Sequence, residues 1–310
     1  MNRLSRSDEQ EAEMLSDKIE SWRELLERCG RKPTKKRVHA LRVATLRIQA
    51  EVEDELKELP RASHEAQAMI RFGKVAEKLR DALGGVRELD VWIGKIQGLR
   101  ESLSGSMTYV PRSSRETSRQ LERLEGRLTR KRESAGEKLA AQIGKRQDNL
   151  LSAARELEKS TRGRADSDED RAEKLLKEFA VIVAEFPTFD EENLHEFRKS
   201  IKKIRYVAEV HEADPRCERI AAQMKKVQGS IGEWHDWQVL ARTAGHGKHA
   251  KGAEAVELLS GLTAEAFEKA LATCDGVVRG MAEMGPESSG VRKAPVRAEV
   301  AGDAADLKRA

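Results

Sequence analysis

The sequence predicts an all-helical protein, and three observations support this fold class. Charged residues make up 36% of the 310-residue chain, aromatic residues only 4%, and there are seven prolines, a composition that favours helices over sheets. Apolar residues recur with the three- and four-residue spacing of a single helix face. No segment of the sequence alternates Val, Ile and Thr with polar residues in the manner of a half-buried strand.

Glycines, prolines and capping residues divide the periodic segments into helices. Gly30 ends the first helix, and Thr34 has the side chain of a good N-cap for the second. The pair Gly84-Gly85 is expected to separate a third helix from a fourth, since glycine is a poor helix former. We expect helices over residues 15–28, 34–59, 64–83, from 86 onward, 113–158, 170–186, 195–212, 215–229 and 254–282.

Composition also divides the chain into two halves. Residues 159–169 contain almost no apolar side chain and are expected to form a linker. This linker separates a first helical bundle over 15–158 from a second over 170–282. Residues 1–14 and 283–310 are polar or rich in Gly, Pro, Ser and Ala, so we expect disordered tails there.

A helix with a cationic edge is the most informative feature of the sequence. At about 100° per residue, one arc of the 194–208 segment is apolar, and its border carries His195, Arg198, Lys202 and Arg205. A second copy lies over 38–52, where the same edge carries Lys35, His39 and Arg42. Residues 31–50 contain seven basic residues and no acidic one, which argues against a solvated face stabilised by ion pairs. The two edges therefore predict a shared anion ligand.

These two copies belong to a longer internal repeat. His39-x-x-Arg42 corresponds to His195-x-x-Arg198, and a downstream block repeats at constant spacing. In that block the corresponding residues are Lys78 and Lys226, Leu83 and Ile231, Gly84 and Gly232, Glu88 and Asp236, and Val91 and Val239. A repeat of about 150 residues indicates two duplicated helical bundles instead of a solenoid.

Three segments resemble the motifs of the conserved histidine α-helical domain (CHAD) family. The segments are Val38-His39-Ala40-Leu41-Arg42-Val43, Leu83-Gly84-Gly85-Val86-Arg87-Glu88-Leu89-Asp90-Val91, and Leu194-His195-Glu196-Phe197-Arg198-Lys199 with Lys202-Lys203-Ile204-Arg205-Tyr206. The resemblance extends over about 15–282. It implies an all-helical fold of two pseudo-symmetric antiparallel bundles that enclose a basic channel. It also implies binding of inorganic polyphosphate, a ligand that composition and spacing alone do not reveal.

The first copy departs from the family pattern. Cations are usual where Leu46 and Gln49 stand, whereas Arg47 is kept. The second copy keeps all of its cations, as Lys202, Lys203 and Arg205. We therefore expect the second half to contribute more to anion binding than the first. Glu88 stands where an Asp is usual, which lengthens the side chain but keeps its charge.

The expected polyphosphate-binding residues combine the two edges with the other basic residues of the repeat. They are Lys35, His39, Arg42, Arg47, Lys78, His195, Arg198, Lys199, Lys202, Lys203, Arg205 and Lys226. Two roles stay open for the histidines, which either donate to phosphate oxygens or are held in place by Glu88 and Asp236. We expect no cofactor and no metal site, since neither histidine has a ligand at i+4 or a nearby cysteine.

The leading hypothesis is a non-enzymatic protein that binds polyphosphate, with recruitment to polyphosphate granules as an extension of that role. An enzyme that cleaves phosphoanhydrides is a weaker alternative, because the sequence lacks a GxxxxGK[ST] loop and a clustered acidic site for Mg²⁺. A nucleic-acid-binding protein is another alternative. Against it, Trp92, Trp234 and Trp237 fit core packing better than base stacking. A helical scaffold without a ligand is the simplest alternative.

A further basic stripe lies in the 113–158 region, where six arginines project within about 120°: Arg112, Arg115, Arg119, Arg123, Arg127 and Arg130. Nearby glutamates make a solvated, ion-paired face an equally good interpretation. Because the formal net charge is only +4, attraction to polyanions must come from such local clusters.

Three scattered cysteines, no export signal and no apolar run of about 18 residues predict a soluble, cytoplasmic protein. The oligomeric state stays open.

Overall fold

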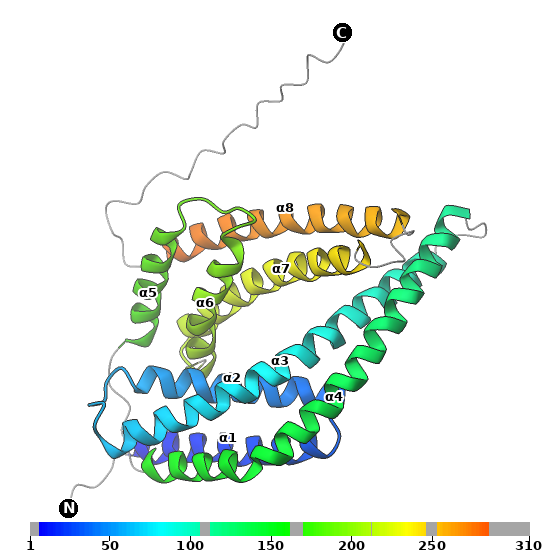
Figure 1. The fold of residues 1–310 in the computed structure, drawn as a ribbon. Coiled ribbons are helices and arrows are strands. Elements are labelled where there is room, and N and C mark those ends of the chain that lie inside the picture. The colour runs from blue at the N-terminus through cyan, green and yellow to red at the C-terminus, as the bar shows by residue number, and fades with distance from the viewer. Residues whose placement is uncertain (1–5, 106–111, 162–169, 212, 246–252, 285–310) are drawn as a thin grey trace, which may run out of the picture.

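The computed structural model describes residues 6–105, 112–161, 170–211, 213–245 and 253–284. In these ranges the chain forms eight α-helices and no β-strand, so the predicted all-helical fold class is confirmed (Figure 1). Helices α3 and α4 form one long antiparallel pair, and α7 and α8 form another (Figure 1). The helices are α1 (Arg6–Arg31), α2 (Lys35–Glu55), α3 (His64–Gly105), α4 (Arg112–Thr161), α5 (Arg171–Glu185), α6 (Leu194–Val210), α7 (Pro215–Gly245) and α8 (Ala253–Glu283).

Side-chain caps fix the start of two helices. Thr34 has extended backbone angles, and its side chain accepts a hydrogen bond of 3.4 Å from the backbone N–H of Arg37. The predicted N-cap is therefore confirmed. Asp170 caps α5 in the same way and accepts from the backbone N–H of Glu173 at 3.0 Å.

The expected helix breaks at glycine are wrong. Helix α3 continues through Gly84-Gly85, and α7 continues through Gly229 and Gly232. No described glycine in these helices adopts a left-handed backbone. Glycine in a helix interior costs only about 0.5–1 kcal/mol relative to alanine. The flanking apolar side chains, such as Leu83 and Ile231, are fully buried, and burial of each contributes about 1.5–3 kcal/mol. Packing therefore offsets the weak helix propensity.

The first core cluster joins α1, α2, the first half of α3 and the second half of α4. Trp22 and Phe72 lie at its centre in an edge-to-face contact, with ring centroids 5.7 Å apart. The indole N–H of Trp22 donates a 2.9 Å hydrogen bond to the buried hydroxyl of Thr45. That bond satisfies two polar groups that would otherwise be costly to bury.

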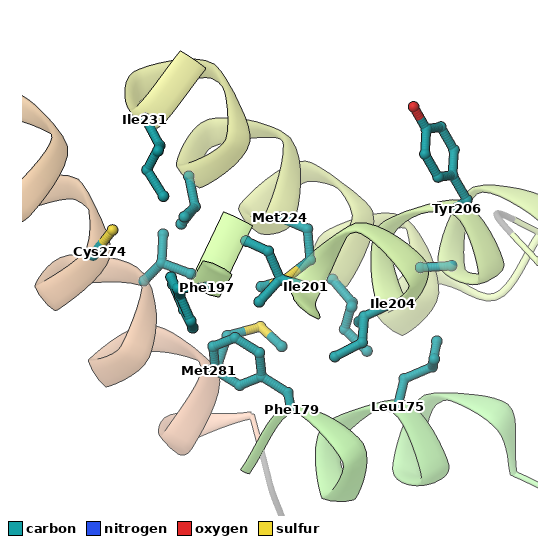
Figure 2. Packing of buried hydrophobic residues seen from close by; sticks show 14 of the residues in the cluster. Leu175, Phe179, Phe197, Ile201, Ile204, Tyr206, Met224, Ile231, Cys274 and Met281 are labelled. Atoms are coloured by element: carbon teal, nitrogen blue, oxygen red, sulfur yellow. The ribbon is translucent and has the colours of Figure 1, made fainter. Parts of the chain in front are cut away.

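The second core cluster is formed mainly by α5, α6, α7 and α8. Figure 2 shows Phe197, Ile201 and Ile204 of α6 packed among the apolar side chains of the neighbouring helices. Tyr206 belongs to the same cluster, but its hydroxyl points away from these side chains (Figure 2). Leu46 and Ala50 of α2, which lie outside its predicted apolar arc, also belong to this second cluster.

The two halves of the sequence share further contacts. A third core cluster joins the second half of α3 and the first half of α4 to the adjoining ends of α7 and α8. At another point of contact, Arg171 of α5 donates to the buried carboxylate of Asp54 of α2 at 2.8 Å. Only 8% of the Asp54 side chain and 11% of the Arg171 side chain are exposed, so this ion pair is well shielded from water.

The expected tails and linker fall largely outside the described residues. Residues 1–5, 162–169 and 285–310 lie outside them. Helix α1 begins at Arg6 and covers residues 6–14 of the expected tail, and α4 ends at Thr161 and covers residues 159–161 of the expected linker.

Candidate functional site

The apolar arc and cationic edge of α6 form as predicted. The apolar residues Leu194, Phe197, Ile201, Ile204 and Ala208 are fully buried. All four cationic residues beside them are half-buried: His195, Arg198, Lys202 and Arg205. The helical period thus places the cations at the rim of the core, where water screens their charge only in part.

The corresponding edge of α2 is more open to solvent. Val38, Leu41 and Ile48 are buried, as the apolar arc requires. Of the cationic edge, Arg42 is half-buried, whereas Lys35 and His39 are exposed. The Lys35 amine lies beside α3, 3.3 Å from the position that a Cβ would take on Gly94.

Arg42, Arg80, Arg198 and Lys202 form a central cationic cluster at the junction of α2, α3 and α6. Helix α2 packs directly against α6. Burial lowers the pKa of the Lys202 amine to about 8, and the charges of Arg42, Arg80 and Arg198 act in the same direction. Burial also lowers the pKa of Arg42, with Arg80 and Arg198 among its like-charged neighbours. Tyr206 lies close enough to both Arg42 and Arg198 for their charges to affect its pKa.

Carboxylates do not neutralise this cluster fully. Within the described ranges, no Asp or Glu forms an ion pair with Arg42, Arg198 or Lys202. Arg80 does have acidic partners, at 3.5 Å from Glu77 and 3.4 Å from Asp81. Asp81 also favours the charged form of Lys202, although its effect is the smallest of those acting on that amine. The cluster therefore carries an excess of positive charge in a partly desolvated place.

Two arginines of the site have equivalent anchors. Arg42 Nη1 donates to the backbone carbonyl of Arg80 at 2.8 Å, and a Cβ on Gly84 would lie 3.1 Å from the same nitrogen. Arg198 Nε donates to the carbonyl of Gln228 at 3.3 Å, and a Cβ on Gly232 would lie 3.2 Å from its Nη2. In both cases the acceptor lies four residues before the glycine, so the internal repeat of the sequence extends to this contact.

A histidine pair lies at one side of α6. The rings of His195 and His235 are tilted by 35°, with centroids 5.3 Å apart. His195 Nδ1 is buried and makes no hydrogen bond. Burial is the largest cause of the lowered pKa of each ring. The charges of Lys199 and Arg198, and that of His235 when it is protonated, act in the same direction on His195. Both rings are therefore mainly neutral at pH 7 when no anion is bound.

His235 and Arg80 were not predicted as site residues. The repeat contains a signal for His235, because the spacing that relates Gly84 to Gly232 relates Arg87 to His235. In the structure Arg87 lies near His39, where its charge helps to lower the pKa of that ring. For Arg80 no comparable signal exists, because the corresponding residue is the neutral Gln228.

The two carboxylates expected to support the histidines have other neighbours. Asp236 accepts a 3.3 Å hydrogen bond from the indole N–H of Trp92 and lies near Lys95. Burial raises the pKa of Asp236, and the charge of His235 opposes that rise. Glu88 is exposed, and its charge acts on Arg42. In the described part of the chain, neither carboxylate forms a hydrogen bond with a histidine of the site.

Most of the additional cations of α6 are ion-paired. Lys199 pairs with Glu196 at 2.8 Å, and Lys203 lies 3.8 Å from Glu53 of α2. Glu209 pairs with Arg205 at 2.8 Å and also with Arg47 of α2 at 3.4 Å. Arg205 additionally donates to the side-chain oxygen of Gln228 at 3.0 Å. The number of cations in the second copy therefore overstates its free positive charge.

The remaining predicted residues lie away from the central cationic cluster. Lys78 lines a small cavity between α3 and α4, opposite Arg146, with Leu79 and Ile143 among the apolar lining. Lys226 is exposed on α7. Along α4, Arg115, Arg119, Arg123, Arg127 and Arg130 are all exposed, and Arg119 lies 3.7 Å from Glu116. The side chain of Arg112 lies outside the described residues.

The two departures from the family pattern have structural reasons. Leu46, which replaces a cation, is 6% exposed and packs in the second core cluster. Gln49, which replaces the other, is 5% exposed and donates to the carbonyl of Gly73 at 3.4 Å. The loss of two charges from α2 thus accompanies contacts that hold α2 against α6 and α3.

Two classes of site are not found among the described residues. None of the helices there has the length and apolar character needed to cross a bilayer. The same ranges contain no group of three or more His, Cys, Asp or Glu side chains placed to hold a metal ion.

Trp234 is buried in the second core cluster, and Trp92 and Trp237 pack against the third, so their predicted packing role is confirmed.

A family model for the CHAD domain matches residues 13–245 of the chain. The chain belongs to the CHAD domain family. The match covers α1 to α7 almost completely and ends at Gly245, whereas the resemblance was expected to extend to about residue 282. No curated protein and no solved structure matches the chain. The central cationic cluster and the histidine pair lie within the part that the CHAD match covers.

Proposed function

We propose that this CHAD domain protein binds inorganic polyphosphate through the central cationic cluster, without cleaving it. The observation that carries the proposal is the set of three cations, Arg42, Arg198 and Lys202, brought together from α2 and α6 without a carboxylate ion pair among the described residues. Holding like charges together in a partly buried place destabilises the folded protein. A bound polyanion reverses that cost.

Polyphosphate fits the chemistry of this cluster. Each repeating unit carries a negative charge and several acceptor oxygens, which suit guanidinium forks and a lysine ammonium. Contacts to phosphate need no aromatic platform, and the tryptophans nearest the site are engaged in packing. His195 lies about one turn before Arg198 and about two turns before Lys202 on α6, where a bound anion would favour its protonation.

We further propose that the chain consists of two pseudo-symmetric bundles that line a basic channel, as the family resemblance implies. The repeated anchor of Arg42 on α3 and of Arg198 on α7 supports the duplication. The packing of α2 against α6 supports a site to which both halves contribute. Recruitment to polyphosphate granules is an extension of this proposal.

Binding of long-chain polyphosphate at two salt concentrations tests the proposal. If the protein neutralises 6–10 phosphates, raising the salt from 50 to 200 mM should lower its affinity by a factor of roughly 10³–10⁵. Replacement of His195, Arg198, Lys202 and Arg205 by alanine should abolish binding while the helical content is retained. Undiminished binding by a folded variant, or an affinity independent of salt, would refute the proposal.

Competition with RNA, DNA and ATP at equal phosphate concentration separates polyphosphate from other phosphate ligands. We expect polyphosphate to be preferred, because the site offers charge without a base-stacking surface. Equal competition by RNA or DNA would favour a nucleic-acid-binding protein instead. Release of orthophosphate from polyphosphate with Mg²⁺, lost on substitution of Glu88 or Asp236, would identify an enzyme.

A further inference from the structure

The two anchored arginines each rest against a glycine in the middle of a continuous helix. Gly84 lies 20 residues after the start of α3, and Gly232 lies 17 residues after the start of α7. Neither has the left-handed backbone that would require glycine. Because glycine is unfavourable in a helix interior, the backbone alone gives no reason for it at either position. What glycine provides at both positions is space for a guanidinium.

Neighbouring glycines of the same helices do not lie against an arginine. A Cβ on Gly85, the next residue of α3, would meet no atom within 4 Å, and the same holds for Gly229 of α7. A Cβ on Gly84 or Gly232 would approach an arginine nitrogen to 3.1 or 3.2 Å, closer than ordinary van der Waals contact. The arginine tip would therefore have to shift by a few tenths of an ångström. Such a shift acts directly on the hydrogen bond that each arginine makes to a helix carbonyl.

Anchoring one edge of a guanidinium prepares the rest of it for a ligand. A guanidinium has five N–H donors, and a single donor of each arginine is used in the bonds to Arg80 and Gln228. The remaining donors are left for an anion, and the side chain loses less rotamer freedom when the anion binds. The two arginines lie close enough for the charge of Arg198 to affect Arg42.

We infer that Gly84 and Gly232 are positioning residues for anion binding, which act by seating Arg42 and Arg198 against the backbone of α3 and α7. This inference rests on the proposed function, because the ligand that the seated arginines meet is polyphosphate. It assigns a role to residues that do not themselves contact the ligand. It also implies that the fold keeps two unfavourable helix residues for the sake of binding.

The test compares Gly84 with Gly85 and Gly232 with Gly229, because a Cβ on either control glycine would meet no atom within 4 Å. Gly84→Ala and Gly232→Ala should each weaken the binding of long-chain polyphosphate about three- to tenfold, the equivalent of one disturbed hydrogen bond. Thermal unfolding midpoints should stay the same or rise, since alanine is the better helix former. The matched controls Gly85→Ala and Gly229→Ala should raise the midpoint and leave affinity within twofold of the wild type.

A double-mutant cycle shows whether the glycine acts through the arginine. Arg42→Lys keeps the charge but removes the fork, so adding Gly84→Ala to it should cause no further loss of affinity. The inference would be overturned if Gly84→Ala and Gly232→Ala bound polyphosphate as tightly as their controls. It would also be overturned if Gly84→Ala lowered the affinity as much in the Arg42→Lys background as in the wild type. Either result would leave the proposed function intact. Failure of the wild-type protein to bind polyphosphate would overturn both.

Discussion

Replacing Lys202 by methionine should stabilise the protein in the absence of a ligand and weaken polyphosphate binding. Lys202 is half-buried among Arg42, Arg80 and Arg198, and burial is the largest cause of its lowered pKa. Methionine has a similar length, keeps the apolar contacts of the lysine stem and removes the charge. The same change should therefore have opposite effects on folding and on binding.

The pKa of Lys202 gives the size and the pH range of the effect. Its lowering from the usual 10.5 to about 8 corresponds to roughly 3 kcal/mol at 1.36 kcal/mol per pH unit, which is an upper limit. Allowing for relaxation and for remaining contact with water, we expect a gain of about 1–2 kcal/mol. Below pH 8 the amine is charged in both the folded and the unfolded state, so the cost is fully present. As the pH rises from 8 towards 10.5, the folded protein releases the proton first, and the cost disappears.

Urea unfolding of the wild type and of Lys202→Met at pH 7 and pH 10 measures this effect. The stability difference should be largest at pH 7 and much smaller at pH 10. Lys199→Met is the matched control, because Lys199 lies on the same helix, is exposed and pairs with Glu196, so its removal should change stability by less than about 0.5 kcal/mol. A Lys202→Met variant that is less stable than the wild type at pH 7, or a difference that does not depend on pH, would refute the reasoning.

Three further predictions follow from the ion pairs and the histidine pair. Glu209→Gln should raise the affinity for polyphosphate several-fold and steepen its salt dependence, because it releases both Arg47 and Arg205; unchanged salt titrations would contradict this. Affinity should rise as the pH falls from 7.5 to 5.5 at constant ionic strength, since a bound anion favours protonation of the half-buried His195, whose pKa is lowered in the free protein. His195→Asn should flatten that profile, and a profile that it leaves unchanged would assign the effect to another group. Asp54→Asn should lower the free energy of unfolding by about 2–4 kcal/mol, because it removes the carboxylate charge from a well-shielded ion pair with Arg171. Polyphosphate titrations should show unchanged affinity, because Asp54 lies about three turns beyond Arg42 on α2; destabilisation below about 0.5 kcal/mol would show that the pair contributes little.

The number of cations in each half of the site does not by itself predict how much that half contributes to anion binding. From the sequence, the second copy of the motif is expected to dominate because it keeps its cations where the first has Leu46 and Gln49. In the structure, three of the additional cations of α6 have carboxylate partners, one of them from α2. Comparison of the polyphosphate affinities of Arg42→Gln and Arg198→Gln will measure the contribution of each half directly. The structure leads us to expect losses of affinity of similar size.

The sequence by itself determined the features that depend on helical periodicity. Which residues of α6 are buried and which cations border them follows from about 3.6 residues per turn, and all five predicted apolar residues of that arc are buried. The N-cap at Thr34 follows equally from local chemistry. The family, too, was recognisable from short motifs of fixed spacing.

Only the tertiary structure decided which charged residues face one another. Arg80 joins Lys202 and His235 joins His195 because α3 and α7 pack beside the cationic helices, contacts between residues more than 35 positions apart in the chain. The continuity of α3 through Gly84-Gly85 was decided in the same way, since helix propensity is a small local term and burial of the flanking side chains is a larger, non-local one. Gly84 therefore appeared as a helix breaker in the sequence and lies against Arg42 in the folded protein.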